Sequence, residues 1–346
     1  MKIKISVILP CRNEEKTVGI CIKKIKEILK GKNYEIIVSD SSSDKSAEIA
    51  KKLGAKVVKH DKEGYGNACI EGAEKASGEI LIFGDADNTY DFMEIPKLLE
   101  YVGEYDLILG QRKFIEKNAM PFSHRYIGNP VLSFVSRLFF HTKIHDINTG
   151  FRAIKKETFD RLGLQTTGME FASEMIIQSA KKKIKIKEVP IHYYRREGDS
   201  KLRTFRDGWR HLRFILLYSP LFLFFIPGIF LFLLATIFLF YNVLFSALFI
   251  IVGYQLVIFA LFAKTYAITH LGDKPIFEPF YKIFSIESAS IIGLFAILLG
   301  VIIYFLIGAN KTESAIVAFT FVVVGIQTIF SSFMLSILGI KNKENF

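Results

Sequence analysis

The sequence predicts an α/β domain with a mostly parallel sheet, followed by a helical transmembrane region. Two observations carry this prediction. Between residues 3 and 101, strand-like apolar runs alternate with helix-like stretches, which is typical of a parallel sheet covered by helices. Further on, three long segments contain no Lys, Arg, Asp or Glu: residues 214–263, 288–310 and 314–340.

The alternating segments come in four pairs. The strand-like runs are residues 3–9, 34–38, 55–59 and 79–83, and the helix-like stretches are 14–29, 44–53, 64–76 and 92–101. Strands joined by crossover helices pair in parallel, so their carboxyl ends meet at one edge of the sheet. Ligands of α/β proteins bind at that edge, and the loop after each strand is therefore examined for functional residues.

The first three of these loops carry polar residues with structural and functional interpretations. In the loop after the first strand, Asn13 can cap the next helix and Glu14 suits its positive end. After the second strand, Asp40 has no capping duty and can accept hydrogen bonds from a base edge. After the third, Gly64-Tyr-Gly66 would bring N–H groups at a helix start near a phosphate.

The fourth loop reads FGDADNTYD and carries three carboxylates, Asp85, Asp87 and Asp91. Proteins hold Mg2+ or Mn2+ with one or two carboxylates, supplemented by substrate phosphates and water, and an Asp-x-Asp at a strand end can supply that pattern. The alternative is a solvated acidic turn that only closes the strand. We expect Asp91 to cap the next helix.

The composition limits the partners. The net charge of +11 is compatible with nucleic acid, but it occurs together with a membrane region, so anionic lipid headgroups and phosphorylated substrates are the expected partners and nucleic acid is not. Three cysteines at no metal-like spacing suit a reducing compartment.

The uncharged segments predict four transmembrane helices. A helical span takes about 20 apolar residues, so residues 214–263 suffice for two spans and the other segments for one each. No secretory signal precedes the first strand, and lysine-bearing connections face the cytoplasm, which predicts a cytoplasmic catalytic domain and C-terminus. These lysines are Lys264, Lys274 and Lys282 after the second span, and Lys341 and Lys343 at the C-terminus.

The segment before the first span predicts an amphipathic helix in the headgroup region of the membrane. Helical spacing puts Phe205, Trp209 and Leu212 on one face and Arg206, Arg210 and Arg213 on the other. The predicted organisation is a catalytic domain at 1–202, this interfacial helix at 203–213, a transmembrane domain at 214–340 and a cytoplasmic tail at 341–346.

The ordered series of loops resembles the family 2 glycosyltransferases with the GT-A fold. The matching motifs are Pro-x-x-Asn-Glu, Val-Ser-Asp, Gly-Tyr-Gly-Asn-Ala and Asp-Ala-Asp. Four later segments resemble the polyprenyl-phosphate sugar synthases, among them the dolichyl-phosphate mannose and glucose synthases. These segments are 110–112, 146–152, 188–191 and 196–202, and the resemblance covers residues 3–215.

The resemblance implies an inverting, metal-dependent hexosyltransferase that uses Mg2+ or Mn2+. It would transfer one hexose from a UDP- or GDP-sugar to a polyprenyl (dolichyl) phosphate at the cytoplasmic membrane face. The implied metal-binding residues are Asp85, Asp87 and Thr89, and the implied nucleotide-binding residues are Pro10, Asn13, Glu14, Asp40, Gly66 and Asp85.

The acceptor phosphate calls for basic side chains, because arginine makes bidentate contacts to phosphate oxygens. The expected acceptor-binding residues are Arg125, Arg152, Arg196, Ser200 and Lys201, and the expected catalytic residues are Asp87, Asp146 and Arg112. Asp146 either orients an arginine, assists the acceptor or caps a turn. Glu174, on a helical stretch with an apolar face, is expected to be a salt-bridge partner.

Several alternatives stay open at this stage. The mannose synthases carry Gln where this chain has Thr89, which leaves the sugar open together with the base, the prenyl length and the oligomeric state. A processive polysaccharide synthase of the same fold would carry Gln-x-x-Arg-Trp, but the only tryptophan, Trp209, lies in Arg-Asp-Gly-Trp. A non-catalytic membrane scaffold or lipid translocator is the other alternative, against which the retained Asp-Ala-Asp argues.

Overall fold

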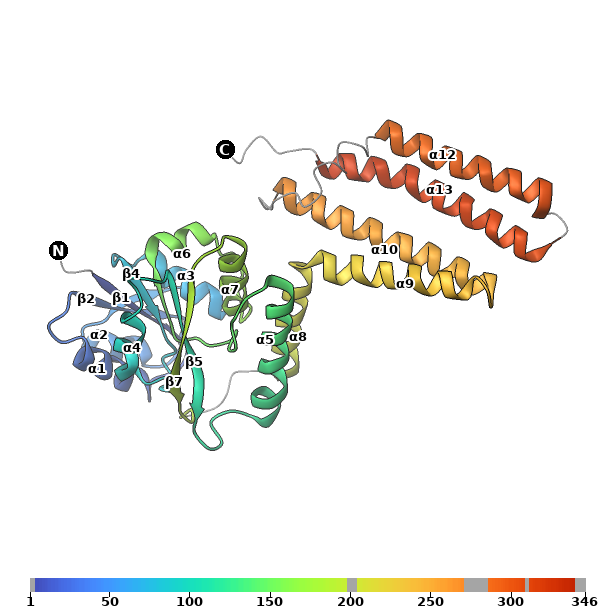
Figure 1. Ribbon diagram of the computed structural model, residues 1–346. Helices are drawn as coiled ribbons and strands as arrows, with labels where there is room; N and C mark the ends of the chain where they lie inside the picture. The colour runs from blue at the N-terminus through green and yellow to red at the C-terminus, as the bar shows by residue number, and fades with distance from the viewer. Residues whose placement is uncertain (1–3, 198–203, 271–285, 309–310, 340–346) are drawn as a thin grey trace. The chain divides into compact units, whose positions relative to one another are not determined.

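The computed structural model describes residues 4–197, 204–270, 286–308 and 311–339 (Figure 1). The chain divides into two compact units, Met1–Ile215 and Leu216–Phe346. The first contains the sheet and the second contains the apolar helices, as the change in composition along the sequence predicts.

The first unit is built on a seven-stranded sheet with the order β3-β2-β1-β4-β6-β5-β7. The strands β1 to β4 pair in parallel, as do β5 and β7, whereas β6 is antiparallel to both β4 and β5. The expectation of a mostly parallel sheet is therefore confirmed. The strands are β1 (Ile5–Cys11), β2 (Tyr34–Asp40), β3 (Lys56–Lys59), β4 (Ile80–Phe83), β5 (Leu107–Ile115), β6 (Arg152–Lys155) and β7 (Ile186–Tyr193).

Helices cover both faces of this sheet (Figure 1). The helices of this part of the chain are α1 (Val18–Ile28), α2 (Ser46–Lys52), α3 (Tyr65–Glu74), α4 (Ile95–Leu99), α5 (Asn129–Phe140), α6 (Lys156–Leu162), α7 (Phe171–Lys181) and α8 (Thr204–Leu217), with the short turns η1 (Phe92–Glu94) and η2 (His124–Gly128). Of these, α5 and α8 stand beside the sheet rather than on its faces (Figure 1). The four expected strand and helix pairs are all present. The ends of these elements differ from the predicted ends by a few residues, because the first residues of the predicted helices belong to loops at the edge of the sheet.

The alternation of side chains along β1 explains how the helices are held. Val7 and Leu9 point to one face and are fully buried in the core that includes Val18 and Ile22 of α1. Ile8 points to the opposite face, where a Cβ added at Gly72 of α3 would lie 2.5 Å from its methyl group. The period of two in the strand therefore gives each face its own helix layer.

The strand register brings the functional loops to one edge. Cys11 of β1 is paired with Asp40 of β2, which is paired with Lys59 of β3. On the other side of β1, Ile8 is paired with Phe83, the last residue of β4. The loops that follow these strands start next to one another, as the parallel arrangement requires.

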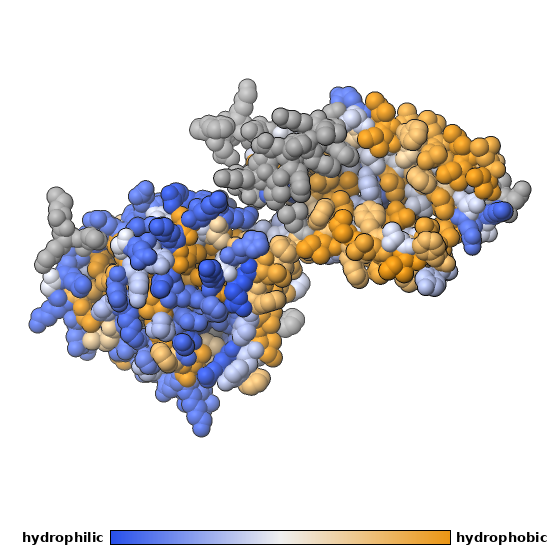
Figure 2. Space-filling view, viewed as in Figure 1, coloured by the Kyte–Doolittle hydropathy of each residue, from blue (hydrophilic) through white to orange (hydrophobic). Residues whose placement is uncertain are grey.

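The second unit consists of apolar helices (Figure 2). They are α9 (Ile226–Phe238) after the turn η3 (Leu221–Phe225), α10 (Val243–His270), α12 (Ile286–Ile303) with the turn η4 (Tyr304–Gly308), and α13 (Thr312–Gly339). Among the described residues, three stretches are long and apolar enough to cross a membrane: Val243–Thr269, Ile286–Ile307 and Thr312–Gly339. The chain is therefore an integral membrane protein by length and composition.

Two details of this unit differ from expectation. The first of the four expected spans is a shorter apolar helix, Phe222–Phe238, so length and composition support only the other three. Lys264 was expected in a cytoplasmic connection, but it lies inside α10 and is only 8% exposed. The helix continues beyond Lys264 to His270. Lys274, Lys282, Lys341 and Lys343 lie outside the described residues.

Small residues bring these helices together. A Cβ added at Gly228 of α9 would lie 2.9 Å from the carbonyl of Gly253 in α10. A Cβ added at Gly293 of α12 would lie 2.7 Å from the carbonyl of Gly325 in α13. Close backbone approach at small residues is the usual packing of membrane helices, and a hydrogen bond of 2.9 Å between Gln327 and Gln255 adds a polar contact.

Gly78 provides a test of the close contact between β1 and the start of β4. A Cβ at this position would lie 2.7 Å from the main-chain nitrogen of Ser6, which cannot move without disturbing the sheet. We expect Gly78→Ala to lower the free energy of unfolding of the first unit by about 1–3 kcal/mol, as overpacking usually does. Thermal unfolding in detergent measures the change. Gly103→Ala is the control because nothing lies within 4 Å of its added Cβ, and equal midpoints for the two variants would contradict the prediction.

Candidate functional site

A cavity of about 1510 Å3 lies in the first unit, bordered by the loops that follow β1 and β4 and by α8. It collects side chains from segments far apart in the chain. Of the predicted site residues, six line it: Pro10, Glu14, Asp85, Asp87, Arg112 and Arg196. The carboxyl edge of the sheet therefore carries a site with acidic and basic groups facing the same space.

Asp85 and Asp87 follow β4 and form the acidic part of the site. One oxygen of Asp85, Oδ1, is buried and has no hydrogen-bond partner among the described residues. Burial and, after it, the charge of Asp87 raise the pKa of Asp85 to about 7, although Arg196 and Arg112 act in the opposite direction. The two arginines therefore offset only part of the negative charge of Asp85 and Asp87. A divalent cation bound by both carboxylates would offset the rest, so these residues fit Mg2+ or Mn2+.

The described part of the chain contains no cluster of three or more His, Cys, Asp or Glu side chains placed to hold a metal ion. A Mg2+ ion held by two carboxylates usually takes its remaining ligands from substrate phosphates and water. Thr89 is the third predicted metal-binding residue. It is 1% exposed, and its hydroxyl donates to Oδ1 of Asp87 over 2.6 Å. This hydrogen bond holds Asp87 in place, and the predicted contact of Thr89 with a metal ion stays a prediction.

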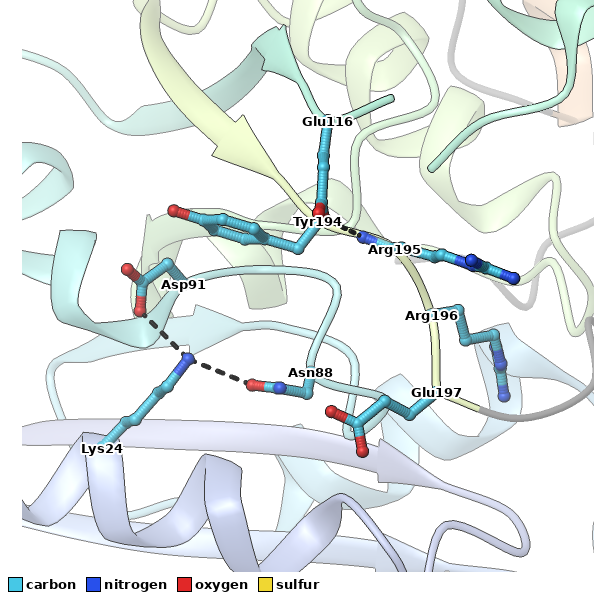
Figure 3. A pocket seen from close by; sticks show the side chains of 8 residues that line it. All are labelled: Lys24, Asn88, Asp91, Glu116, Tyr194, Arg195, Arg196 and Glu197. Carbon is cyan, nitrogen blue, oxygen red and sulfur yellow. Dashed lines mark hydrogen bonds and ion pairs between the residues drawn. The ribbon is translucent and has the colours of Figure 1, made fainter. Parts of the chain in front are cut away.

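Arg196 connects the acidic residues of two loops. Its Nη1 donates to Oδ2 of Asp87 over 2.8 Å, and its Nη2 donates to Oε1 of Glu14. Arg196 also lines a second cavity of about 690 Å3, shown in Figure 3. There Asp91 accepts a hydrogen bond from the N–H of Met93 and pairs with Lys24 at 3.4 Å, which confirms Asp91 as a cap.

Arg112 and Asp146 form a buried ion pair next to the acidic residues. Nε of Arg112 donates to Oδ2 of Asp146 over 2.8 Å and Nη2 donates to Oδ1 over 2.7 Å. Burial by itself would raise the pKa of Asp146, but the charge and hydrogen bonds of Arg112 outweigh it and the pKa is lowered. Of this pair, Arg112 lines the large cavity and Asp146 does not. Of the alternatives open from the sequence, the orientation of an arginine is the one that the contacts of Asp146 support.

Arg152 does not reach the site. It is 2% exposed, and Nε, Nη1 and Nη2 donate to the carbonyls of Thr149, Ala172 and Ile147 over 2.7, 2.8 and 3.1 Å. These bonds tie the end of β6 to α7. The expected role in acceptor binding is therefore wrong, because the guanidinium group is committed to main-chain carbonyls inside the fold.

The glycine-rich start of α3 is also used internally. The N–H groups of Gly66 and Asn67 donate to the carbonyls of Gly168 and Thr167, each over 3.2 Å. A Cβ at Gly66 would lie 2.1 Å from the carbonyl oxygen of Thr166, so glycine is required for this close approach. The expected phosphate contact of Gly66 is replaced by a contact with another loop.

That loop is held by Glu174, which is 1% exposed. Its carboxylate accepts hydrogen bonds from the N–H groups of Gln165 and Thr166 and from the Thr166 hydroxyl, the last over 2.6 Å. The expectation that Glu174 is a salt-bridge partner is not met by these contacts. Its buried carboxylate acts as the acceptor for the main-chain N–H groups of this loop.

Asn13 joins the loops after β1 and β2. Its side-chain oxygen accepts a hydrogen bond from the N–H of Ser43 over 2.9 Å, and its own N–H donates to the hydroxyl of Ser42 over 2.8 Å. The helix α1 begins only at Val18, so Asn13 does not cap it as expected. Its contribution to a nucleotide site would be to hold the two loops in register.

Asp40 has the surroundings expected of a ligand-binding group. It is 1% exposed, and neither carboxylate oxygen has a hydrogen-bond partner among the described residues. A buried carboxylate without a donor is costly, which points to a donor supplied from outside the chain. The negative charge of Asp40 also contributes, after burial, to raising the pKa of Cys11 to about 12, so this cysteine stays a neutral core residue.

The remaining acceptor candidates lie elsewhere. Arg125 stacks over the ring of Tyr126 at 5.3 Å, and it is not among the residues that line the large cavity. Ser200 and Lys201 lie outside the described residues. Sequence reasoning missed Tyr65 and Tyr193, which line the cavity beside Asp85 and Arg112. The only signal for Tyr65 was its place inside the Gly-Tyr-Gly-Asn-Ala motif, whereas Tyr193 lies between the segments 188–191 and 196–202 and had no such signal.

The surface beside the cavity is apolar (Figure 2). α8 is anchored by His211, which is 6% exposed and lies 2.7 Å from the hydroxyl of Ser173, while Trp209 is 54% exposed. The side chains of Phe205 and Arg206 are not described. The segment around α5 adds a row of exposed apolar side chains: Phe122, Tyr126, Ile127, Val131, Phe134 and Leu138.

Comparison with known proteins shows what this chain is similar to. Residues 6–163 match the family model of glycosyl transferase family 2, and residues 261–339 match the model of the glycosyltransferase family 2 C-terminal transmembrane region. The low-salt glycan biosynthesis hexosyltransferase Agl6 of Haloferax volcanii is 34% identical, over 97% of this chain and 89% of Agl6. The dolichyl-phosphate hexose transferase of the same organism is 31% identical, over 59% of this chain and 89% of its own length.

Solved structures agree on the fold. Glucosyl-3-phosphoglycerate synthase from Mycobacterium tuberculosis, in complex with Mn2+, UDP and glucosyl-3-phosphoglycerate, superposes with a TM-score of 0.52 at 20% identity, covering 63% of this chain and 80% of that chain. The fold, the ordered motifs and a relative that matches along nearly the whole chain lead to one conclusion: this protein is a member of glycosyltransferase family 2 that resembles the polyprenyl-phosphate sugar synthases.

Proposed function

We propose that this protein transfers a single hexose from a UDP- or GDP-sugar to a polyprenyl (dolichyl) phosphate, with inversion and with the help of Mg2+ or Mn2+. The observation that carries the proposal is the cavity in which the carboxylates Asp85 and Asp87 face the guanidinium groups of Arg112 and Arg196. A donor diphosphate and an acceptor phosphate need both kinds of group. The relatives named as hexose transferases support the hexose.

The donor would bind along the loops that follow β1, β2 and β4. The carboxylate of Asp40, which has no hydrogen-bond partner among the described residues, would accept hydrogen bonds from the base, and Pro10 and Glu14 line the large cavity. Asp85 and Asp87 would hold the divalent cation together with the diphosphate. When bound, this ion would neutralise the charge that develops on the diphosphate as the glycosidic bond breaks.

The acceptor would need positioning more than a general base. The second pKa of a phosphate monoester is about 6, so the acceptor is mostly a dianion at neutral pH and already a nucleophile. Arg112 can hold its oxygens while Asp146 keeps the guanidinium oriented from behind. One displacement by the phosphate oxygen at the anomeric carbon, with departure of the nucleoside diphosphate, inverts that carbon.

The exposed apolar surface supports catalysis at the membrane. Trp209 of α8 and the exposed side chains of η2 and α5 suit the boundary between headgroups and acyl chains, where a polyprenyl phosphate presents its head. We propose that this surface faces the cytoplasmic leaflet. The catalytic unit and the C-terminus would then share the cytoplasmic side, which requires that Phe222–Phe238 crosses the membrane as a short span.

The reaction is tested by replacing Asp87 with Asn. Because the variant loses a carboxylate that would hold the cation, we expect transfer to fall on the order of 100-fold or more. Membranes with the protein are incubated with labelled UDP- and GDP-sugars, polyprenyl phosphate and Mg2+ or Mn2+, and the lipid-extractable label is measured. Asp91→Asn is the control and should keep most activity. If no donor gives labelled lipid with the unaltered protein, the proposed function is wrong.

The role of Asp146 is tested separately. Asp146→Asn leaves the buried guanidinium of Arg112 without its counter-charge, so we expect a loss of about 3 kcal/mol in the free energy of unfolding together with reduced transfer. Thermal unfolding and the transfer assay provide the two measurements. The matched control is Asp106→Asn, whose partly exposed pair with Lys155 should cost at most about 1 kcal/mol. Equal losses in both variants would contradict the assignment.

The topology is tested with single introduced cysteines. We expect Lys311→Cys, between α12 and α13, to react with a membrane-impermeant maleimide added outside intact cells, and Lys32→Cys, in the catalytic unit, to react only after permeabilisation. The three native cysteines are buried and give little background. If both positions react from the same side, Phe222–Phe238 does not cross the membrane and the proposed orientation has to be revised.

A further inference from the structure

Arg196 links two acidic residues that the donor site would need for other purposes. Its guanidinium group donates to Asp87 and to Glu14, which belong to different loops. The side chains are 22%, 10% and 8% exposed for Arg196, Glu14 and Asp87, so the contacts are shielded from solvent. The guanidinium group of Arg196 thus pairs with the carboxylate of Asp87, which is also a candidate ligand of the divalent cation.

Hydrogen bonds hold the main chain just before Arg196. A change of partners by Arg196 would therefore involve its side chain and not this part of the main chain. The N–H of Tyr194 donates to the carbonyl of Thr89 over 2.8 Å, and the N–H of Arg195 donates to Glu116 over 2.9 Å. Both anchors belong to the segments that frame the smaller cavity (Figure 3). Arg196 lines this cavity and the large one, so rotation of its side chain moves it along a shared wall.

The arginine is also left with an unused donor. Nε of Arg196 is buried and has no hydrogen-bond partner among the described residues. A guanidinium group offers five N–H donors in a fixed fork, and a buried donor without an acceptor is unfavourable. An anion with several oxygens, such as a diphosphate, satisfies more of these donors than two separate carboxylates do.

We propose that Arg196 is an internal counter-ion that neutralises Asp87 and Glu14 before the donor binds, is displaced from them by the divalent cation, and then pairs with the donor diphosphate. The inference rests on the proposed function for the identity of the diphosphate. The first step, in which the cation displaces Arg196 from Asp87 and Glu14, does not depend on the identity of the donor. Metal binding then has to compete with the ion pairs of Arg196. The metal therefore binds more tightly when a phosphate is present to pair with the arginine.

The test is the affinity of the full-length protein in detergent for Mn2+ alone, measured by the decrease of the free Mn2+ signal in electron paramagnetic resonance. If Arg196 occupies the carboxylates in about nine-tenths of the molecules, the apparent dissociation constant is raised about tenfold. We therefore expect Arg196→Met to bind Mn2+ about tenfold more tightly than the unaltered protein. Arg195→Met removes the same charge from the neighbouring residue, whose main-chain N–H donates to Glu116 rather than to Asp87 or Glu14, and should bind Mn2+ as the unaltered protein does.

A second measurement guards against misfolding and separates the two proposals. Without metal, Arg196→Met should unfold at a lower temperature than the unaltered protein because Asp87 and Glu14 lose their counter-ion. Saturating Mn2+ should restore the unfolding midpoint. The midpoint of Arg196→Lys without metal should lie between those of Arg196→Met and the unaltered protein. With Mn2+ present, UDP and GDP should bind Arg196→Met more weakly than the unaltered protein. Equal Mn2+ affinity in all variants overturns the counter-ion role, even if Arg196→Met is inactive. Tighter Mn2+ binding without any sugar transfer by the unaltered protein upholds that role and refutes the proposed function.

Discussion

The balance between carboxylates and guanidinium groups at the carboxyl edge of the sheet is the constraint on which the site depends. Asp85, Asp87 and Glu14 meet there, and burial raises the pKa of Asp85. Arg112 and Arg196 act in the opposite direction, but Oδ1 of Asp85 stays without a partner in the described structure. Such a site is stable enough to form before the ligands arrive and retains a preference for added positive charge.

The rest of the first unit holds these charges at fixed positions. The Thr89 hydroxyl holds Asp87 and the Asp146 carboxylate holds Arg112, so each of these two cavity-lining groups has a partner that does not line the cavity. Buried polar contacts are expensive when incomplete, and the fold meets this by committing Arg152 and Glu174 to main-chain groups of the surrounding loops. The loops at the site are therefore held by hydrogen bonds rather than by a larger apolar core.

The apolar helices serve a different requirement. A lipid-linked phosphate lies at the membrane surface, and an enzyme that uses it gains from staying there. Helices packed through Gly228, Gly253, Gly293 and Gly325 provide a stable membrane unit with few polar groups. In the proposed function, the exposed apolar side chains around α5 would give the first unit a second way to contact lipid. Agl6, which matches along nearly its whole length, shows that this combination of units recurs in a named hexosyltransferase.

Local patterns in the sequence determined the mostly parallel sheet, three of the four expected spans, the cap at Asp91 and the gathering of Asp85 and Asp87 at a strand end. These follow from hydrophobic periodicity and chain order, which act within a few residues. Which polar residues reach the cavity was decided by tertiary contacts. Arg152 and Gly66 sit in motifs of the right kind, but neighbouring loops take their hydrogen bonds, whereas Arg196 comes from 109 residues beyond Asp87 to pair with it. A side chain's partner depends on which segments fold against it, and sequence spacing carries no record of that.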